Sequence, residues 1–419
     1  MKLRLLAFVV VMALCTHGAF TKTADDYRTG TADPLIVRMP SSVTSYKSKG
    51  AETYLEKVAE YIANNAVDDF DKVKKLHDWT ALNIRYNTGA FFSGRIPDQT
   101  VSNVISSGQA VCAGYSEVFL HLCKLLDIEC ETVTGYARGY GRSVFGSENP
   151  YNSSHAWNKV RINGDWYLID TTWDAGYVNG RSYVARYRTD YLFPPPEQYI
   201  HDHFPGNSAD QFLTVPLPAE DFVNLPMVRP VFFSQVTELS PVMQKITKVK
   251  GRFFRIDFTS KYYFMFHLSS PSGRGENNNL SSSRRSGKMT VYLSFNRPGN
   301  SEMELFSSPT GTGTHDGIGE FGFNVEIPEV KWGEIPGDAE LLFPEVQELA
   351  KNTQIDFKVK PGKWKYLVLI RNNSWQYLSP DDDGIFTIKY NTYSAGTFYL
   401  AGSETESGMY ETLAEFKVN

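Results

Sequence analysis

Residues 153–173 read Ser-Ser-His-Ala-Trp-Asn-Lys-Val-Arg-Ile-Asn-Gly-Asp-Trp-Tyr-Leu-Ile-Asp-Thr-Thr-Trp. Asn163-Gly164-Asp165 is a strong turn signal between two runs rich in β-branched and aromatic residues, so the stretch predicts a β-hairpin. The hairpin places His155 and Asp170 on adjacent antiparallel strands, near cross-strand register. In that arrangement a carboxylate can hold one nitrogen of an imidazole while the other nitrogen faces a reacting group.

Cys112 lies upstream of the hairpin, at the start of a helix predicted over residues 112–126. Amide groups without partners in the first turn of a helix favour a thiolate there. An isolated cysteine is more often a buried structural thiol. The position of Cys112 and the His155 and Asp170 that follow it favour a nucleophile, a base and an orienting residue, in that order. This is the residue set of thiol acyl transfer.

Apolar residues at helical spacing predict two more helices before Cys112, and alternating residues predict strands after it. The helices cover residues 51–66 and 67–86, and the strands cover residues 131–136, 155–162 and 166–171. His77 on the second helix is interpreted as a core histidine. The stretch from Gly135 to Gly146 resembles a mobile flap more than a phosphate loop.

Beyond residue 228 the chain consists of short alternating strands separated by Gly, Ser and Asn turns, which is typical of one or two β-sandwich modules. Ser269 to Gly287 is predicted to be a long surface loop. The strand candidates are residues 253–258, 262–268, 289–295, 365–370, 385–390 and 396–400.

The N-terminus has the pattern of a secretory signal: Lys2 and Arg4, then an apolar run over residues 5–14 that is too short to span a bilayer. Residues 1–19 are therefore predicted to be a signal peptide and the protein to be secreted. Once Cys15 has left with the leader, three cysteines remain. An odd number in a secreted protein suggests a reactive thiol, which fits Cys112. Cys123 and Cys130 either pair or are buried free thiols, and free thiols are slightly favoured.

Composition excludes several function classes. The net charge of the 419 residues is −5 and no basic run appears, so a nucleic-acid partner is not expected. No later segment is long and apolar enough to cross a membrane. His201-Asp202-His203 offers only two neighbouring imidazoles and is interpreted as a packing feature. No metal site and no cofactor are predicted.

The segments around Cys112-Ala113-Gly114-Tyr115, His155-Ala-Trp-Asn and Asp170-Thr-Thr-Trp resemble the transglutaminase-like superfamily. Together with Lys75-Leu-His-Asp-Trp79 and residues 190–205, they are most similar to its kyphoscoliosis peptidase and hillarin branch. The resemblance implies an α+β fold with a papain-like transglutaminase core, followed by β-sandwich modules. It also implies that Cys112 is the nucleophile, His155 the base and Asp170 the orienting residue.

The predicted organisation is a signal peptide (1–19), an extended N-terminal segment (20–50), a catalytic domain (51–227) and a β-rich region (228–419). The favoured function is a secreted cysteine peptidase acting on protein or peptide substrates. Transglutaminases with well-described activity place a Trp directly after the nucleophile, and Ala113 stands there. A protein-glutamine transglutaminase or deamidase remains the alternative. A further alternative is a non-catalytic adhesion or scaffold protein whose β modules bind protein partners.

Overall fold

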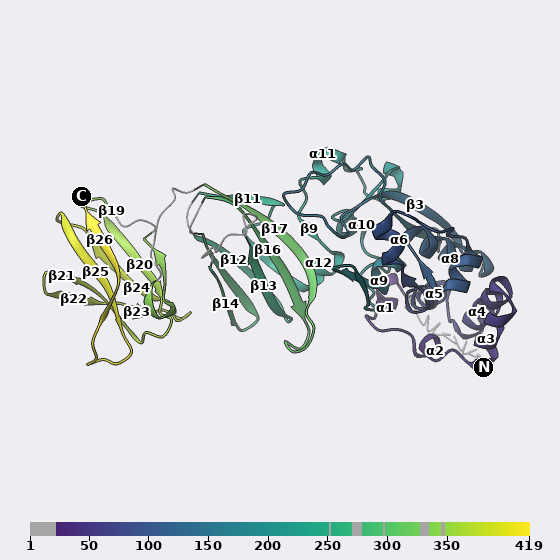
Figure 1. Ribbon diagram of the computed structural model, residues 1–419, viewed down its shortest axis with the longest axis horizontal. Helices are drawn as coiled ribbons and strands as arrows, with labels where there is room; N and C mark the ends of the chain where they lie inside the picture. The colour runs from purple at the N-terminus through teal and green to yellow at the C-terminus, as the bar shows by residue number, and fades with distance from the viewer. Residues whose placement is uncertain (1–21, 251–252, 270–278, 296–297, 327–334, 345–347) are drawn as a thin grey trace, which may run out of the picture. The chain divides into compact units, whose positions relative to one another are not determined.

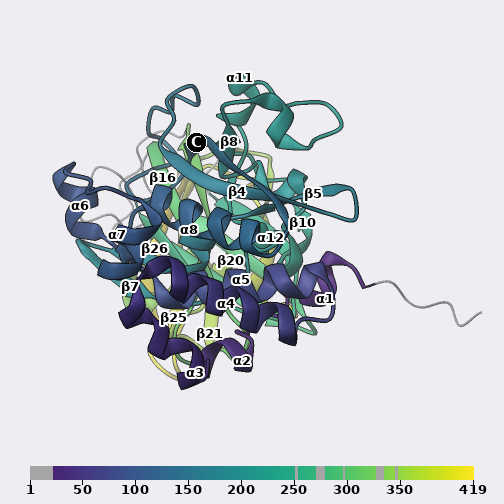
Figure 2. The same cartoon turned by 90° about the vertical axis from the view of Figure 1, so that its right-hand side faces the viewer.

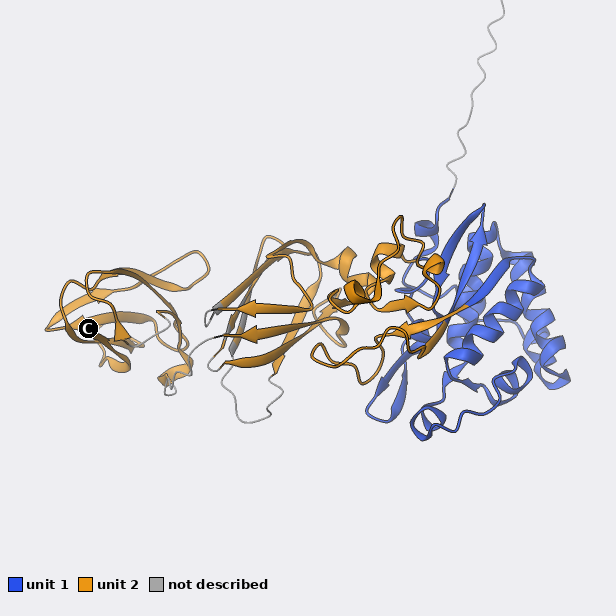
Figure 3. Ribbon diagram, turned by 90° about the horizontal axis from the view of Figure 1, so that it is seen from above, with its two compact units in different colours: residues 1–132, 157–193 blue, residues 133–156, 194–419 orange. Residues whose placement is uncertain are grey.

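The computed structural model describes residues 22–250, 253–269, 279–295, 298–326, 335–344 and 348–419, and Figure 1 shows the order of the elements. The predicted signal peptide lies outside these residues. Figure 3 divides the chain into two compact units, residues 1–132 with 157–193 and residues 133–156 with 194–419. Within the described residues, none of the helices has the length and apolar composition that a membrane crossing requires. The predicted division at residue 228 stays a prediction.

The N-terminal segment, for which an extended course was expected, folds into short helical turns. Proline and acidic caps explain them: Pro34 occupies the first position of its helix, and the Asp33 carboxylate accepts the Leu35 N–H. These turns are α1 (Ala24–Tyr27), α2 (Pro34–Val37), α3 (Ser41–Thr44) and the 3-10 helix η1 (Ser45–Lys49).

Three longer helices make the core of the first unit, close to their predicted bounds: α4 (Ala51–Asn65), α5 (Asp69–Asn83) and α8 (Cys112–Leu125). Leu55, Val58 and Leu122 are completely buried and belong to one apolar core. Figure 2 shows α4, α5 and α8 close to one another. The smaller elements of this unit are α6 (Thr88–Ser93), α7 (Val101–Ser107), α9 (Thr171–Ala175), β1 (Arg85–Tyr86), β2 (Gln109–Ala110), β6 (Gly176–Asn179) and β7 (Ser182–Ala185).

A four-stranded sheet in the order β5-β4-β3-β8 follows the helices. Its strands are β3 (Glu129–Ala137), β4 (His155–Ile162), β5 (Asp165–Ile169) and β8 (His203–Pro205). The predicted hairpin is present as β4 and β5, which pair antiparallel from Ile162↔Asp165 to Asn158↔Ile169. Val160 and Ile162 belong to the same apolar core as the helices, so one face of this hairpin packs on them.

Two β-sandwich modules complete the chain, each with its own apolar core. The first has one sheet in the order β10-β12-β15-β14 and another in the order β11-β17-β16-β13, and β9 pairs with β17. Its strands are β9 (Met227–Val228), β10 (Thr237–Ser240), β11 (Ile246–Val249), β12 (Phe253–Thr259), β13 (Tyr263–Ser269), β14 (Asn279–Arg285), β15 (Lys288–Ser294), β16 (Gly299–Ser308) and β17 (Asp316–Val325).

The second module has sheets in the orders β18-β20-β24-β23 and β19-β26-β25-β21-β22. Its strands are β18 (Glu340–Phe343), β19 (Glu348–Leu349), β20 (Gln354–Lys360), β21 (Tyr366–Arg371), β22 (Ser374–Tyr377), β23 (Ser379–Pro380), β24 (Phe386–Asn391), β25 (Gly396–Ser403) and β26 (Glu411–Val418). The short helices of the second unit are α10 (Pro196–Tyr199), η2 (Ser208–Gln211), α11 (Ala219–Phe222), α12 (Pro230–Gln235) and η3 (Pro336–Asp338).

All six strand candidates beyond residue 228 are confirmed, within one to three residues at their ends. The long loop predicted for Ser269 to Gly287 is wrong in its second half, because residues 279–285 form β14 and pair with β15. That strand is rich in Ser and Arg, so no apolar alternation reveals it. Residues 270–278 lie outside the described residues.

The first β-sandwich should respond to pH through Glu320. Burial, and then the neighbouring Glu302 and Glu304 carboxylates, raise the pKa of Glu320 to about 7. A carboxyl whose pKa is higher in the folded than in the unfolded chain binds protons on folding, so stability falls as pH rises from about 4.5 towards 7. We expect Glu320→Gln to remove this decline and to be more stable than the wild type at pH 8.

Urea unfolding of both proteins at pH 5 and pH 8 checks this expectation. Glu415→Gln, an exposed position in the second module, is the control and should leave the pH dependence unchanged. A Glu320→Gln protein whose stability still declines as the wild type's does would contradict the assignment.

Candidate functional site

Cys112 is the first residue of α8 and is half-buried. The residue before it, Val111, donates its N–H to Gln99 Oε1 at 2.9 Å. Position 114 has no space for a side chain, since a Cβ there would lie 2.6 Å from Gln99 Oε1 and 2.7 Å from Ala110 Cβ. The Cys-Ala-Gly sequence is therefore what lets the helix start pack tightly, and the predicted place of Cys112 in the first turn is confirmed.

Tyr86 connects Cys112 with Asp170. Strand β1 runs parallel to β2 with Tyr86 opposite Ala110, two residues before Cys112. Burial raises the pKa of the Tyr86 phenol, and the negative charges of Cys112 and Asp170 raise it further. The phenol is therefore close enough to both groups to feel their charge. Sequence reasoning gave Tyr86 no role; its position in the short strand β1 that follows α5 is a weak signal that could have indicated one.

Asp170 is 1% exposed and caps the N-terminus of α9. Its Oδ1 accepts the N–H groups of Thr172 at 2.8 Å and Trp173 at 3.2 Å, and its own N–H donates to the carbonyl of Tyr191 at 3.1 Å. These bonds use one carboxylate oxygen for the helix cap. The other oxygen, Oδ2, takes no part in the two capping bonds, which suits the orienting role predicted for this residue.

His155 is the first residue of β4 and is half-buried. The observed register differs from the predicted one: because Asn158 pairs with Ile169, one further step puts Trp157, and not His155, opposite Asp170. His155 lies two residues beyond Trp157, on the same face of the strand. Farther along β4, Asn158 Nδ2 donates to the Ser116 carbonyl at 3.1 Å, which ties the strand to α8 one turn from Cys112.

His203 is a neighbour of His155 that sequence reasoning did not identify. The two ring centroids are 5.4 Å apart, and ring nitrogens of the two lie within 4.8 Å of one another. His203 is fully buried, stacks on Tyr199 at 4.2 Å and makes a hydrogen bond with Asp202 Oδ1 at 2.6 Å. The interpretation of residues 201–203 as a packing feature thus misses a histidine that lies against the predicted base.

The loop that leads from β3 to His155 is held by a buried ion cluster. Arg138 Nε lies 2.9 Å from Glu148 Oε1, and Lys245 Nζ lies 2.6 Å from Glu148 Oε2. Burial opposes the charge of Glu148, but the two cations outweigh it and lower its pKa. Arg138 also donates to the carbonyls of His201, Phe222 and Leu225. The loop predicted as a mobile flap is therefore anchored at both of its ends.

Three aromatic residues near the predicted triad differ in how much surface they expose. Tyr115 is completely buried and its hydroxyl donates to the Ile84 carbonyl at 2.7 Å, and Trp157 is 1% exposed. Both are core residues. Trp173 is half-buried and packs edge-on against Tyr191, with ring centroids 5.2 Å apart. Of the three, Trp173 alone has surface to offer a substrate.

None of Cys112, Cys123 and Cys130 forms a disulfide in the described residues. Cys123 is completely buried, and burial, followed by its hydrogen bond with Cys130, raises its pKa. Iodoacetamide reacts with exposed thiolates, so we expect native protein to be alkylated at Cys112 and protected at Cys123. Peptide mass spectrometry before and after unfolding in urea measures this. Rapid native modification of Cys123 would contradict the described packing.

Comparison with known proteins supports the resemblance found in the sequence. Residues 56–171 match the family model of the transglutaminase-like superfamily, a range that includes Cys112, His155 and Asp170. Human kyphoscoliosis peptidase is 27% identical over 246 residues, which cover 58% of this chain and 37% of that protein. Hillarin of Drosophila melanogaster is 22% identical over 203 residues, covering 45% of this chain and 24% of that protein.

Among solved structures, the crystal structure of a TGase is similar with a TM-score of 0.24 and 21% identity, covering 30% of this chain and 31% of that one. The chain spans less than two fifths of the length of kyphoscoliosis peptidase. Residues 56–171 are therefore a domain of the transglutaminase-like superfamily, in a chain related to the branch that contains kyphoscoliosis peptidase and hillarin.

Proposed function

We propose that this protein is a thiol acyl-transfer enzyme that cleaves protein substrates, with Cys112 as nucleophile, His155 as base and Asp170 as the residue that orients the histidine. The observation that carries the proposal is the placement of Cys112 in the first turn of α8 and of Asp170 as a buried carboxylate capping α9, with the half-buried Tyr86 phenol close to both. His155 lies on the same face of β4 as Trp157, and continuing the hairpin register puts Trp157 opposite Asp170. This arrangement further supports the proposal.

The chemistry would proceed in two halves. The Cys112 thiolate attacks a peptide carbonyl, and the backbone N–H of Cys112, in the first turn of α8, would donate to the oxyanion that forms. Protonated His155 gives its proton to the leaving amine, which produces an acyl-enzyme. His155 then takes a proton from water, and the hydroxide releases the acid and restores the thiolate. No cofactor is required at any step.

Mass spectrometry of the protein incubated with a mixed protein substrate and a tagged primary amine tests the proposal. Cys112→Ala is the inactive control, and Cys130→Ala is the matched control for a cysteine outside the predicted site. New peptide termini that disappear only with Cys112→Ala support a peptidase. Tagged or deamidated glutamines without cleavage would instead support a transglutaminase or deamidase. No product under reducing conditions, with and without calcium, favours the binding role of the β modules.

We also propose that the protein acts outside the cell. Lys2 and Arg4, followed by the apolar run over residues 5–14, support this. Expression of the full sequence in a secreting host, followed by N-terminal sequencing of protein from the medium, tests the proposal. A mature terminus near residue 19 is expected. Full-length protein retained in the cells would overturn it.

A further inference from the structure

Helix α5 buries a histidine between two carboxylates. His77 is completely buried, with Nδ1 3.0 Å from Asp78 Oδ1 and Nε2 2.9 Å from Asp174 Oδ2. A neutral imidazole can donate from only one nitrogen, and an ionised carboxylate can only accept. Burial opposes a charge on His77, but its hydrogen bonds with Asp174 and Asp78 outweigh burial and raise its pKa. Burial also raises the pKa of Asp174, and its hydrogen bond with His77 opposes this rise. Because each ring nitrogen of His77 faces a carboxylate oxygen, we take the proton to lie on His77, which then donates to both acids.

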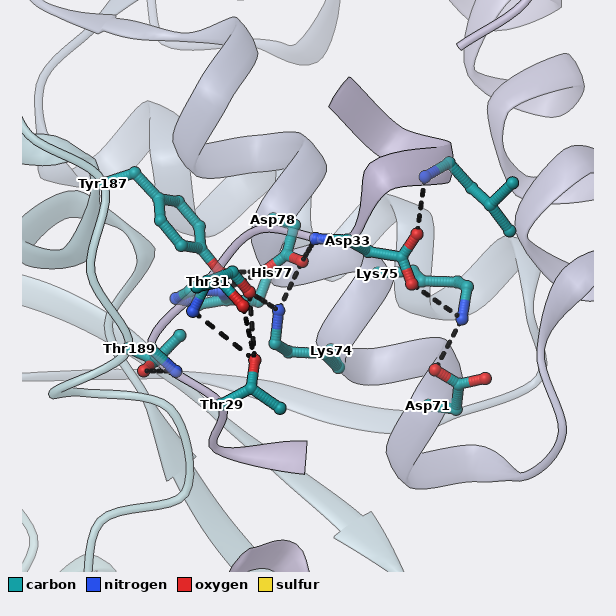
Figure 4. A network of polar contacts seen from close by, with 12 residues as sticks. Thr29, Thr31, Asp33, Asp71, Lys74, Lys75, His77, Asp78, Tyr187 and Thr189 are labelled. Atoms are coloured by element: carbon teal, nitrogen blue, oxygen red, sulfur yellow. Dashed lines mark hydrogen bonds and ion pairs between the residues drawn. The ribbon is translucent and has the colours of Figure 1, made fainter. Parts of the chain in front are cut away.

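Asp78 is fixed from several sides, so it holds His77 in one orientation. Its Oδ2 lies 2.5 Å from Lys74 Nζ and accepts the N–H of Asp33 at 2.7 Å, and its Oδ1 accepts the Tyr187 hydroxyl at 2.5 Å. Lys74 Nζ also donates to the carbonyl of Thr31 at 2.9 Å. Figure 4 shows Lys74, Asp78 and Tyr187 converging. Thr29, Thr31 and Asp33 of the N-terminal segment lie beside them in the same view.

Asp174 leads from this network to the proposed site. It belongs to α9, and its backbone N–H donates to the Asp170 carbonyl at 3.3 Å. Its Oδ2 also accepts the N–H of Tyr191 at 3.0 Å, and the Tyr191 carbonyl accepts the N–H of Asp170. Asp174 and Asp170 are thus held at opposite ends of one helical turn and by the same residue, Tyr191. A shift of the Asp174 carboxylate would move the turn that Asp170 caps.

We propose that His77 is a positioning residue for the site, because its clamp on Asp174 fixes α9 and so sets the direction of the Asp170 carboxylate. This inference rests on the proposed function, in which Asp170 orients His155. A merely structural His77 would contribute stability alone. A positioning His77 also sets how well His155 stabilises the Cys112 thiolate, and that can be measured without knowing the substrate.

The rate of Cys112 alkylation by iodoacetamide, followed against pH on the full chain by peptide mass spectrometry, is the test. In the wild type we expect reactivity to persist below pH 7, as in a thiolate–imidazolium pair. Gln at position 77 cannot donate to both carboxylates, so His77→Gln should lower the rate at pH 6 by about tenfold or more and leave the rate at pH 9 unchanged. Hydrogen exchange of the amides of residues 171–175 should accelerate in the same variant.

Lys75→Met is the matched control. Lys75 is equally buried on α5, but its ion-pair partners are Asp71 at 2.5 Å and Asp33 at 3.2 Å, and not α9. It should lower the melting temperature and keep the wild-type pH profile. A His77→Gln protein with the wild-type profile would overturn the inference and leave the proposed function intact. A wild type whose Cys112 reacts only as an ordinary thiol would instead refute the proposed function.

Two further measurements cover the case in which His77→Gln does not fold. Asp174→Asn keeps the shape of the side chain and removes its charge, and it should lower the alkylation rate at pH 6 in the same way. In the wild type, nitrogen-15 NMR should show both ring nitrogens of His77 protonated at pH 7. A neutral His77 ring would contradict the proposal directly.

Discussion

An alanine in place of His155 should reduce turnover by about 10,000-fold or more, because the thiolate loses its counter-ion and the leaving amine loses its proton donor. Removing one member of a triad costs about as much as removing the whole set, so no other side chain is expected to compensate. The loss should fall on kcat, since His155 acts on the reacting atoms. Steady-state kinetics on a peptide substrate found by the mass-spectrometric screen measures it.

The matched control is His121→Ala, a half-buried histidine on α8 that pairs with Glu52 at 3.3 Å. It should retain most of the activity. Free imidazole added to the His155→Ala protein should restore part of the rate, which a misfolded protein would not show. A His155→Ala protein that keeps a tenth or more of the wild-type kcat would remove His155 from the mechanism.

Replacing Asp174 with alanine should lower the free energy of unfolding by about 3–5 kcal/mol, the range for breaking a buried ion pair by removing one partner. The change leaves the His77 imidazolium with Asp78 alone and deprives the Tyr191 N–H of its acceptor. The His77 Nε2–H and the Tyr191 N–H would then both be buried without a hydrogen-bond acceptor. Urea unfolding at pH 7, followed by circular dichroism, gives the difference between the two proteins.

Asp98→Ala serves as the control for Asp174→Ala, because Asp98 bonds only locally, to Thr100 and Asn103, in an exposed turn. Its effect should stay below about 1 kcal/mol, as for most surface changes. An Asp174→Ala protein with an equally small loss would mean that His77 is neutral, since a neutral imidazole needs only one acceptor.

Local features of the sequence were predicted well. The Asn-Gly-Asp turn specifies a hairpin through backbone preferences of a few residues, so the bounds of β4 are those predicted. The start of α8 at Cys112 follows from the Ser-Ser-Gly break before it and the apolar spacing after it. Six strands of the β-sandwiches were found because alternation marks each strand separately, whatever its partners, whereas β14 lacks that alternation and was missed.

Features that depend on distant residues were not predicted. His77 was correctly placed in the core, but its partner Asp174 lies on another helix, and no sequence period connects the two. His155 and His203 lie close together because β8 pairs with β3. That pairing depends on the packing of the whole sheet and not on the local sequence. The two-residue offset of His155 in the hairpin has a simpler cause: pairing centred on Asn163-Gly164 continues to Trp157 opposite Asp170, and His155 lies two residues beyond.

The ion cluster of Arg138, Glu148 and Lys245 has a practical consequence for dissecting the chain. The sequence invites a cut after residue 227, which would give a short catalytic fragment for crystallisation or assay. Lys245 lies beyond that cut, so the fragment would keep the Glu148 carboxylate while losing one of its two cations. Inactivity of such a fragment would therefore say little about the proposed activity of the whole chain. A fragment that retains the first β-sandwich keeps both cations beside the Glu148 carboxylate in the loop before His155.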